Sequence, residues 1–494
     1  MMASTTAVEC TGNAPDAIYR QENMRHFDCV VVGSGPAGQK AAIQAAKLGK
    51  KVAVIEKTNV LGGATVNTGT IPSKALREAV MHLTGASKRG LFGASYRVKR
   101  NITITDLIYV SQQVIHHELE LIRDHFERNG IDVIWGMAKF TSPTTIQIDR
   151  PEETEVISGE KFIIATGSRP ARPSTVPFDF KSIFCSDSLL KMEKVPKTMI
   201  VVGGGVIGTE YGCMMATLGV RVTLIEGRNE LLGFLDREIT ESLHYQLRRM
   251  GVTLRLGEKV DKIQLIQPEA GNAASNGDLV KCTLESGKHL FAETLLFAVG
   301  RQGTTTALGL DGIGLKADSR ERLKVNEFYQ TELPHIYAVG DVIGFPSLAS
   351  TSMEQGRQAA CHAFGAPTFC VPELFPYGVY SVPEISMVGK TEGQLTEAGI
   401  PYEAGVALYK EIARGQLLGD ENGMLKILIH QDNHQILGCH AIGTGATELI
   451  HIGQAVMAFK GTVDYFINNV FNFPTLAEAY KVAALNGLNK LRHI

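Results

Sequence analysis

The chain has 494 residues, of which 44% are hydrophobic and 20% are charged, and its formal net charge at pH 7 is −2. At one domain per roughly 100 to 200 residues, this length predicts about three domains. Nucleic acids and anionic membrane surfaces attract proteins with a basic excess or patch, so the near balance of charge argues against both kinds of partner.

The eight cysteines are scattered along the chain, and no two of them form a CxxC pair. This distribution is typical of a reducing compartment and argues against a structural zinc site or a secreted disulfide framework. The histidines also lack metal-ligand spacing, so we predict no metal. The first residues are polar and contain no apolar run long enough for a signal or membrane segment. We therefore expect residues 1–26 to be a flexible extension and the protein to be cytoplasmic.

The first ordered region predicts a strand, a glycine turn, a helix rich in small residues and a second strand. It runs from residue 27 through VVVGSGPAGQKAAIQAAKLGKKVAVIEK and places an acid, Glu56, at the end of the second strand. Three glycines fill the GxGxxG positions of the turn: Gly33, Gly35 and Gly38.

The same pattern returns in the run VVGGGVIGTEYGCMMATLGVRVTLIEGR, which begins at residue 201 and whose second strand ends at Glu226. The turn glycines of this copy are Gly203, Gly205 and Gly208. In both copies the acid stands 23 positions after the first glycine, from 33 to 56 and from 203 to 226. The two units therefore match in register.

The spacing has a physical reason. The first glycine permits a tight turn, the second lets backbone NH groups approach a pyrophosphate, and the third lets the helix pack on the strand. The diphosphate then lies at the positive end of the helix dipole, and the acid binds ribose hydroxyls. One such turn is a weak signal, because glycine turns also serve packing alone, but two copies in register predict two dinucleotide sites.

Between the units we expect a helix over residues 105–129 and a β-rich region over 131–164 that ends in the turn ATGSRP. The second unit closes with LLFAVGR at 295–301, and IYAVGDV at 336–342 ends a further strand ahead of a helix near Ser352. Asp341 follows that strand. It either faces the ligand crevice of an open α/β sheet or caps the helix, and both roles can hold. From residue 372 alternating strands and two late helices predict a separate α+β domain.

These motifs resemble the pyridine nucleotide disulfide oxidoreductase family, and the similarity runs from residue 27 to the C-terminus. Within the family, TGTIPSKALREAV at 68–80 and FNFPTLAEAYKVAALNGLNKL at 471–491 are most similar to the soluble transhydrogenase branch. The resemblance implies an α/β fold with two Rossmann-like dinucleotide-binding domains and a C-terminal α+β dimerisation domain. We expect an FAD-binding domain at 27–180 and 302–371, an NAD(P)-binding domain at 181–301, and dimerisation through 372–494 to a homodimer or larger homo-oligomer.

By the same resemblance, one group of residues lies around FAD: Gly33, Gly35, Gly38, Glu56, Lys57, Gly62, Gly63, Thr65, Lys74, Gly167, Gly340 and Asp341. A second group binds the nicotinamide nucleotide: Gly203, Gly205, Gly208, Glu226, Arg228 and Gly300. The family pairs the lysine of the PSK motif with a glutamate of the second glycine helix, here Lys74 and Glu210, and a cation beside flavin N5 would stabilise reduced flavin. Alternatively, Lys74 decorates its own helix and Arg228 is a solvated surface charge.

Three positions depart from the family pattern. Threonine stands at 65 and 70, where the family has redox cysteines, and Phe473 replaces the histidine of its HPTxxE segment, while Glu478 keeps the glutamate. Hydroxyls cannot form a disulfide, and phenylalanine cannot transfer a proton. The branch itself usually has cysteine at 65 and tyrosine at 473.

With the sites for both dinucleotides kept and the disulfide lost, the resemblance implies FAD-dependent hydride transfer between NADPH and NAD. One site would serve NAD and NADP in turn, because Glu226 favours free ribose hydroxyls and Arg228 favours a 2′-phosphate. Two alternatives remain: a quinone or dye reductase that uses the same sites, and an inactive relic that acts as a binding protein.

Overall fold

The computed structural model describes residues 24–266, 279–368 and 374–491. The chain forms two compact units. Unit 1 contains residues up to 63 together with 120–168 and 303–369, and unit 2 contains 64–119, 169–302 and the residues from 370 onward. Residues 64–119 thus pack with the second nucleotide unit, whereas the sequence analysis assigned them to the first domain; the three-domain division itself stays a prediction. Within the described ranges, no helix is long and apolar enough to cross a membrane.

Unit 1 is built on a seven-stranded sheet. Its order is β3 (Asp132–Trp135), β2 (Val52–Glu56), β1 (Arg25–Val32), β6 (Thr154–Ile164), β5 (Thr145–Asp149) and β4 (Met137–Ser142), and β17 (Ile336–Ala338) also pairs with β6. The strands β1, β2, β3, β6 and β17 run parallel, and β4 and β5 are antiparallel. Strand β2 and most of β1 are buried, as expected for parallel strands covered on both faces.

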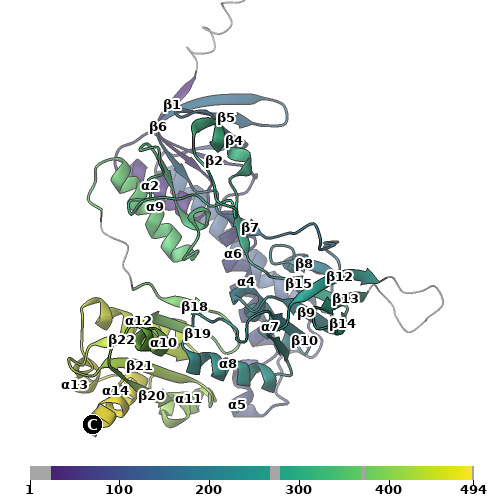
Figure 1. The fold of residues 1–494 in the computed structure, drawn as a ribbon, viewed down its shortest axis with the longest axis vertical. Coiled ribbons are helices and arrows are strands. Elements are labelled where there is room, and N and C mark those ends of the chain that lie inside the picture. The colour runs from purple at the N-terminus through teal and green to yellow at the C-terminus, as the bar shows by residue number, and fades with distance from the viewer. Residues whose placement is uncertain (1–23, 267–278, 369–373, 492–494) are drawn as a thin grey trace, which may run out of the picture. The chain divides into compact units, whose positions relative to one another are not determined.

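Two helices of unit 1, α2 (Pro36–Lys47) and α9 (Ala349–Ala363), lie side by side (Figure 1). Their contact is close because Gly356 faces the backbone of α2. A Cβ added to Gly356 would lie 2.0 Å from the carbonyl oxygen of Ala37. The helix α6 (Ile104–Arg128) matches the one expected between the two glycine units.

The start of the first strand corrects one expectation. The extension was predicted to end at residue 26, but β1 begins at Arg25, which aligns with Ile157 of β6 and forms an ion pair with Glu155. The strand therefore begins two residues before the apolar run from which the sequence predicted it. Residues 1–23 lie outside the described residues.

Unit 2 contains the second glycine unit in a parallel sheet. The order is β11 (Thr253–Leu256), β10 (Arg221–Glu226), β9 (Thr198–Val202), β15 (Thr294–Phe297) and β8 (Ile183–Cys185). The helices α7 (Val206–Thr217) and α8 (Arg237–Arg249) follow β9 and β10. An antiparallel sheet of β12 (Val260–Ile266), β13 (Leu279–Leu284) and β14 (His289–Ala292) is inserted before β15.

The C-terminal part of unit 2 is an antiparallel sheet in the order β18 (Tyr377–Val379), β19 (Ile385–Gly389), β22 (Ile436–Ile442), β21 (Met424–His430) and β20 (Tyr402–Leu408). The two expected late helices are α12 (Ala446–Ala458) and α14 (Glu478–Leu491) (Figure 1). Three shorter helices were not expected, namely α10 (Glu392–Glu397), α11 (Ala413–Leu418) and α13 (Asp464–Asn468). Helices of five or six residues are too short to show a 3.6-residue apolar period.

One apolar core holds unit 2 together. It combines Leu76 of α4 (Thr70–Leu83), Tyr211 of α7 and Leu224 of β10 with Ile385 of β19 and Ile442 of β22, all of them buried. The segment around the PSK motif, the nucleotide sheet and the C-terminal sheet are therefore parts of the same packed body.

Candidate functional site

The first glycine turn connects β1 to α2. Gly33 has a φ of +105°, and a Cβ there would lie 2.5 Å from the carbonyl oxygen of Ala165. A Cβ on Gly38 would lie 1.9 Å from the carbonyl oxygen of Gly33. The first and third glycines are therefore required by the protein's own packing.

Gly35 is different, because the nearest atom to its added Cβ is the Cα of Gly63, at 4.0 Å. Gly35 also precedes α2 without any side-chain cap, so the first NH groups of that helix remain available. Among the described residues no atom excludes a side chain at this position, so the space beside Gly35 would admit a pyrophosphate on the helix N-terminus.

The acid at the end of β2 is held by four neutral donors. Glu56 is 6% exposed. Its Oε2 accepts from the backbone NH and the hydroxyl of Ser34, at 3.0 and 2.7 Å. Its Oε1 accepts from the NH and hydroxyl of Thr58, at 3.1 and 3.0 Å. The hydroxyl of Ser34 in turn accepts from the NH of Gly62, so the acid, the turn and the Gly62–Gly63 loop form one network. Lys57 beside it is exposed.

Strand register brings the other unit 1 candidates to the same edge. Ile164 of β6 aligns with both Val32 of β1 and Ala338 of β17, so the segments that follow these residues meet. Gly167 and Gly340 lie in those segments. The NH of Gly340 donates to Gln355 Oε1 at 2.8 Å.

Asp341 lies at this edge in a short 3-10 helix rather than at the start of α9. The 3-10 helix is Gly340–Ile343, and α9 begins eight positions beyond Asp341, after Leu348 as its N-cap residue. Its Oδ2 accepts from the hydroxyl of Ser168 at 2.6 Å. The helix-cap alternative for Asp341 is therefore wrong, and the side chain stays at the carboxyl edge of the sheet.

The second glycine turn repeats the first. Gly203 has a φ of +105°, and its added Cβ would lie 2.6 Å from the carbonyl oxygen of Ala298. For Gly208 the clash is with the carbonyl oxygen of Gly203, at 1.9 Å, and for Gly205 no atom lies within 4 Å. Gly300 follows β15, the strand next to β9, at the same edge. In each unit the second glycine thus has open space beside it among the described residues, and both sets of residues fit a bound dinucleotide.

Glu226 ends β10 as Glu56 ends β2, but its partner is a cation. The Oε2 accepts from the NH of Gly204 at 2.7 Å, and Oε1 accepts from the NH of Arg228 at 3.0 Å. The guanidinium of Arg228 also donates to both oxygens, from Nε at 3.0 Å and from Nη2 at 3.2 Å. Burial tends to raise the pKa of Glu226, but the hydrogen bonds from Arg228 and Gly204 hold it below its ordinary value. Arg228 is therefore not simply a solvated surface charge.

Lys74 and Glu210 form the expected pair within unit 2. Lys74 Nζ lies 2.8 Å from Oε2 of Glu210, a carboxylate whose side chain is 4% exposed. Sequence reasoning missed a third member. The NH of Tyr380 donates to Glu210 Oε1 at 2.8 Å, and Lys74 Nζ lies 4.9 Å from the centre of the Tyr380 ring. A backbone donor leaves no trace in residue type, so no sequence signal identified it.

Comparison with known families decides the assignment. Residues 27–356 match the description "Pyridine nucleotide-disulphide oxidoreductase", and residues 375–484 match the dimerisation domain of the same family. The chain belongs to the pyridine nucleotide-disulphide oxidoreductase family. Membership implies binding of a flavin and of a nicotinamide nucleotide, and the dimerisation domain indicates self-association.

Relatives in this family match over nearly the whole chain. A protein of Mycobacterium bovis named "Soluble pyridine nucleotide transhydrogenase" is 52% identical, covering 95% of this chain and 98% of its own length. Proteins of the same name from Marinomonas sp. and Shigella flexneri are 45% identical, covering 94% of this chain and 99% and 98% of their own lengths.

Two solved structures have a similar fold. The HOCl-induced flavoprotein disulfide reductase RclA from Escherichia coli has a TM-score of 0.82 at 26% identity, covering 93% of this chain and 99% of that chain. LpdA from Mycobacterium tuberculosis has a TM-score of 0.83 at 23% identity, covering 94% and 99%, a likeness of fold.

The family's disulfide positions hold hydroxyls here. Thr65 lies in the short helix α3 (Gly63–Asn67), and Thr70 is the exposed first residue of α4. The described residues include six free cysteines, and all six are buried. Burial raises the pKa of the thiols of Cys29 and Cys213 to about 12, so neither forms a thiolate near neutral pH.

The family's histidine-glutamate segment is also altered. Phe473 is 71% exposed, so within one chain it packs against little. Glu478 is the first residue of α14, and its Oε2 is shielded from solvent without a hydrogen-bond partner among the described residues. Truncating Phe473 is therefore not expected to open a cavity within the single chain.

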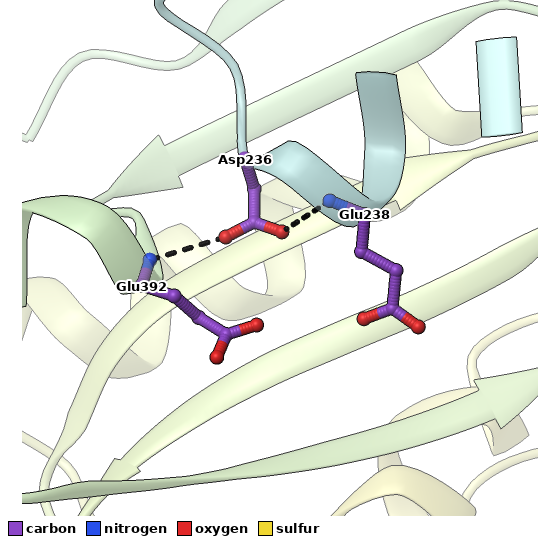
Figure 2. A group of neighbouring side chains, drawn as sticks. All are labelled: Asp236, Glu238 and Glu392. Atoms are coloured by element: carbon purple, nitrogen blue, oxygen red, sulfur yellow. Dashed lines mark hydrogen bonds between the residues drawn. The ribbon is translucent and has the colours of Figure 1, made fainter. Parts of the chain in front are cut away.

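Three carboxylates of unit 2 gather in a way that sequence spacing did not predict: Asp236, Glu238 and Glu392 (Figure 2). Asp236 caps α8 by accepting from the NH of Glu238, and it also accepts from the NH of Glu392. The ammonium of fully buried Lys426 donates to all three, with 2.8 Å to Asp236 and 2.9 Å to Glu238.

The lysine is the cation of this group. Burial alone would lower the pKa of Lys426, but the hydrogen bonds to Asp236, Glu392 and Glu238 raise it above its ordinary value. The chain itself therefore supplies the cation that these carboxylates surround, and we assign no metal to them.

Proposed function

We propose that this chain is a pyridine nucleotide transhydrogenase that uses FAD and transfers hydride between NADPH and NAD. The relatives at 45 to 52% identity are named for this activity and match along nearly the entire chain. The same names do not favour the two alternatives, a quinone or dye reductase and an inactive relic.

The observation that carries the proposal is that both glycine turns are kept with open space at their second glycine, while both redox cysteines and the histidine of the family pattern are replaced. Gly35 and Gly205 leave room that no described protein atom fills. Thr65 and Thr70 cannot store electrons as a disulfide, and Phe473 cannot transfer a proton. A chain with these features retains what hydride transfer requires and lacks what disulfide reduction requires.

In this proposal the first glycine unit holds FAD. The diphosphate lies on the N-terminus of α2 at Gly35, Glu56 faces the adenosine ribose, and Asp341 at the carboxyl edge of β17 faces the ribitol chain. The flavin, when bound, supplies a hydride acceptor and donor at N5. Lys57, Gly62, Gly63, Thr65, Gly167 and Gly340 complete the proposed site.

Lys74 is proposed to stabilise the negative charge of the reduced flavin. Glu210 and the ring of Tyr380 hold its ammonium, which limits the positions the flexible lysine side chain can take. A fixed cation stabilises developing charge better than a mobile one, because no reorganisation is needed when the charge appears.

The second glycine unit would bind NADPH and NAD in turn. The diphosphate lies at Gly205 and the N-terminus of α7, with Gly203, Gly208 and Gly300 shaping the turn, and Glu226 and Arg228 lie where the adenosine ribose would. Residues from about 372 onward would form the homodimer. The free cysteines fit a reducing compartment and support the cytoplasmic location suggested by composition.

An anaerobic titration of the purified flavoprotein tests the proposal. An equimolar amount of NADPH should bleach the flavin directly, and NAD should then restore its colour with release of NADH. Lipoamide and glutathione disulfide should not be reduced. A long-wavelength charge-transfer band on reduction, or quinone turnover without turnover of NAD, would contradict the proposal.

A further inference from the structure

The hydrogen bonds of Glu226 restrict how a ribose can bind. A carboxylate offers about four lone-pair sites. In Glu226 all four are used: Oε2 accepts from Gly204 NH and Arg228 Nη2, and Oε1 accepts from Arg228 NH and Nε. A ribose hydroxyl can therefore bind Glu226 only when the guanidinium of Arg228 withdraws.

Arg228 is free to withdraw. Its side chain is 58% exposed, against 11% for Glu226, and in the described part of the chain its ion pairs involve Glu226 alone, with Glu230 attracting it at longer range. Water can solvate the exposed guanidinium when the two charges separate, whereas Glu226 keeps little access to solvent. The pair is thus closed at rest and opens when a ligand group competes for one of its members.

A second cation lies on the adjacent loop. Lys259 follows β11, and its stem crosses Gly227, the residue between Glu226 and Arg228. A Cβ on Gly227 would lie 3.3 Å from Lys259 Cγ and 3.9 Å from its Cε. The loop is tied in place, since the NH of Gly257 donates to the carbonyl of Arg228 at 2.8 Å and the NH of Glu258 to that of Glu226 at 3.2 Å.

Lys259 differs from its charged neighbours in having no counterion. Glu258, next to it, is paired with Lys288. The described residues place no carboxylate within ion-pair distance of Lys259, whose side chain is exposed. The end of β10 therefore has two positive side chains near it, Arg228 and the unpaired Lys259, whose stem lies against Gly227.

We propose that Arg228 and Lys259 form a 2′-phosphate subsite that opens when Arg228 leaves Glu226. With a 2′-phosphate present, the guanidinium moves to the phosphate and Lys259 supplies the second charge. With two free hydroxyls, Arg228 moves to solvent and the hydroxyls donate to Glu226. This inference rests on the proposed function and explains how one site accepts both nucleotides.

Equilibrium binding to the intact flavoprotein tests it, with 2′,5′-ADP and 5′-AMP as probes, because these differ only in the 2′-phosphate. Lys259→Gln should weaken 2′,5′-ADP about tenfold, as expected for one charge-assisted hydrogen bond, and leave 5′-AMP within about twofold. Lys262→Gln, a matched change at an exposed lysine of β12, should alter neither. Unchanged 2′,5′-ADP affinity in Lys259→Gln, or an equal loss for both probes, would overturn the proposal.

A second variant tests the opening of the pair. Glu226→Gln keeps the size of the side chain but no longer holds Arg228 by charge, so the preference for 2′,5′-ADP over 5′-AMP should rise at least about tenfold. A preference that stays the same or falls would show that the ion pair does not compete with the phosphate. This variant also decides the matter if Lys259→Gln lowers the Tm or flavin content.

Turnover separates this inference from the proposed function. If the parent protein transfers hydride from NADPH to thio-NAD but Lys259→Gln binds 2′,5′-ADP unchanged, the subsite is wrong and the activity stands. If the parent binds 2′,5′-ADP through Lys259 but transfers no hydride, the subsite stands and the activity is wrong.

Discussion

The two glycine units have nearly the same backbone and differ in what holds their terminal acids. In each, the residue two positions after the acid donates its NH to Oε1, and the residue after the first glycine donates its NH to Oε2. In the first unit these residues are Ser34 and Thr58, whose hydroxyls add two neutral hydrogen bonds. In the second, Arg228 adds a charged pair in place of the hydroxyl of Thr58.

Under the proposed function, this difference matches a first site that keeps its cofactor and a second site that exchanges its nucleotide. Glu56 is buried in a closed network of short side chains. Glu226 is covered by a long, exposed arginine that can leave. A cofactor that remains through turnover suits the first arrangement, and a substrate that enters and departs in each cycle suits the second.

The largest expected effect is a loss of nucleotide binding in the second glycine unit alone. Gly205→Val should weaken nicotinamide nucleotides by about a hundredfold or more, roughly 2.7 kcal/mol, because the side chain occupies the path of the diphosphate. The backbone at Gly205 is extended, with φ −75° and ψ −173°, so the fold should tolerate valine. Equilibrium binding of NADH and the flavin absorbance would check both statements.

The matched change in the first unit is Gly35→Val, which should give protein that lacks flavin. Gly208→Ala serves as the contrast, because its Cβ would strike the carbonyl of Gly203 and should lower the Tm. If Gly205→Val binds NADH normally, the space beside that glycine is not the diphosphate site.

A medium effect on NADPH affinity is expected when the partner of the acid in the second unit is replaced by its counterpart in the first. Arg228→Thr places at 228 the residue found at the equivalent position 58. Loss of a charged partner of a phosphate costs about 1.5 to 3 kcal/mol, or roughly ten to a hundredfold in binding. NADPH affinity should fall by that factor and NADH affinity should stay nearly unchanged. Equal losses for the two nucleotides would place their discrimination elsewhere.

A smaller effect, on stability, is expected from substituting the equivalent residue of the first unit, Thr58. Thr58→Val removes one neutral hydroxyl donor from Glu56 while its NH remains. Such a hydrogen bond contributes about 0.5 to 1.5 kcal/mol, so a modest drop in Tm with nearly full flavin content should follow. Complete loss of flavin would show that the closed network depends on this hydroxyl.

The smallest effect is expected outside both units. Glu478→Gln should leave transhydrogenase turnover within about twofold of the parent, because hydride transfer needs no protein base. Steady-state rates with NADPH and thio-NAD at matched flavin content would measure it. Abolished turnover with unchanged flavin content and oligomer size would make the carboxylate catalytic and add a proton step to the mechanism.

Much of this arrangement could be predicted from sequence because backbone sterics impose it. A positive φ requires glycine at positions 33 and 203. The length of the second strand sets where Glu56 and Glu226 stand, so the spacing of these residues alone identified both turns. Main-chain and long-range contacts could not be predicted. The NH of Tyr380 donates a hydrogen bond to Glu210, from which it is separated by 170 positions in the sequence. The hydroxyl of Ser168 donates to Asp341 over a separation of 173 positions. Neither contact requires a residue type that stands out.

The buried ammonium of Lys426 has a consequence for exchanging parts between relatives. Its carboxylate partners come from the start of α8 and the start of α10, while the lysine itself is on β21. Replacing Lys426 alone would leave the buried carboxylate of Asp236 without its cation, a loss of about 3 to 5 kcal/mol. A chimaera that takes its nucleotide-binding segment from one relative and its C-terminal segment from another should therefore fold only if Asp236 and Lys426 are inherited together.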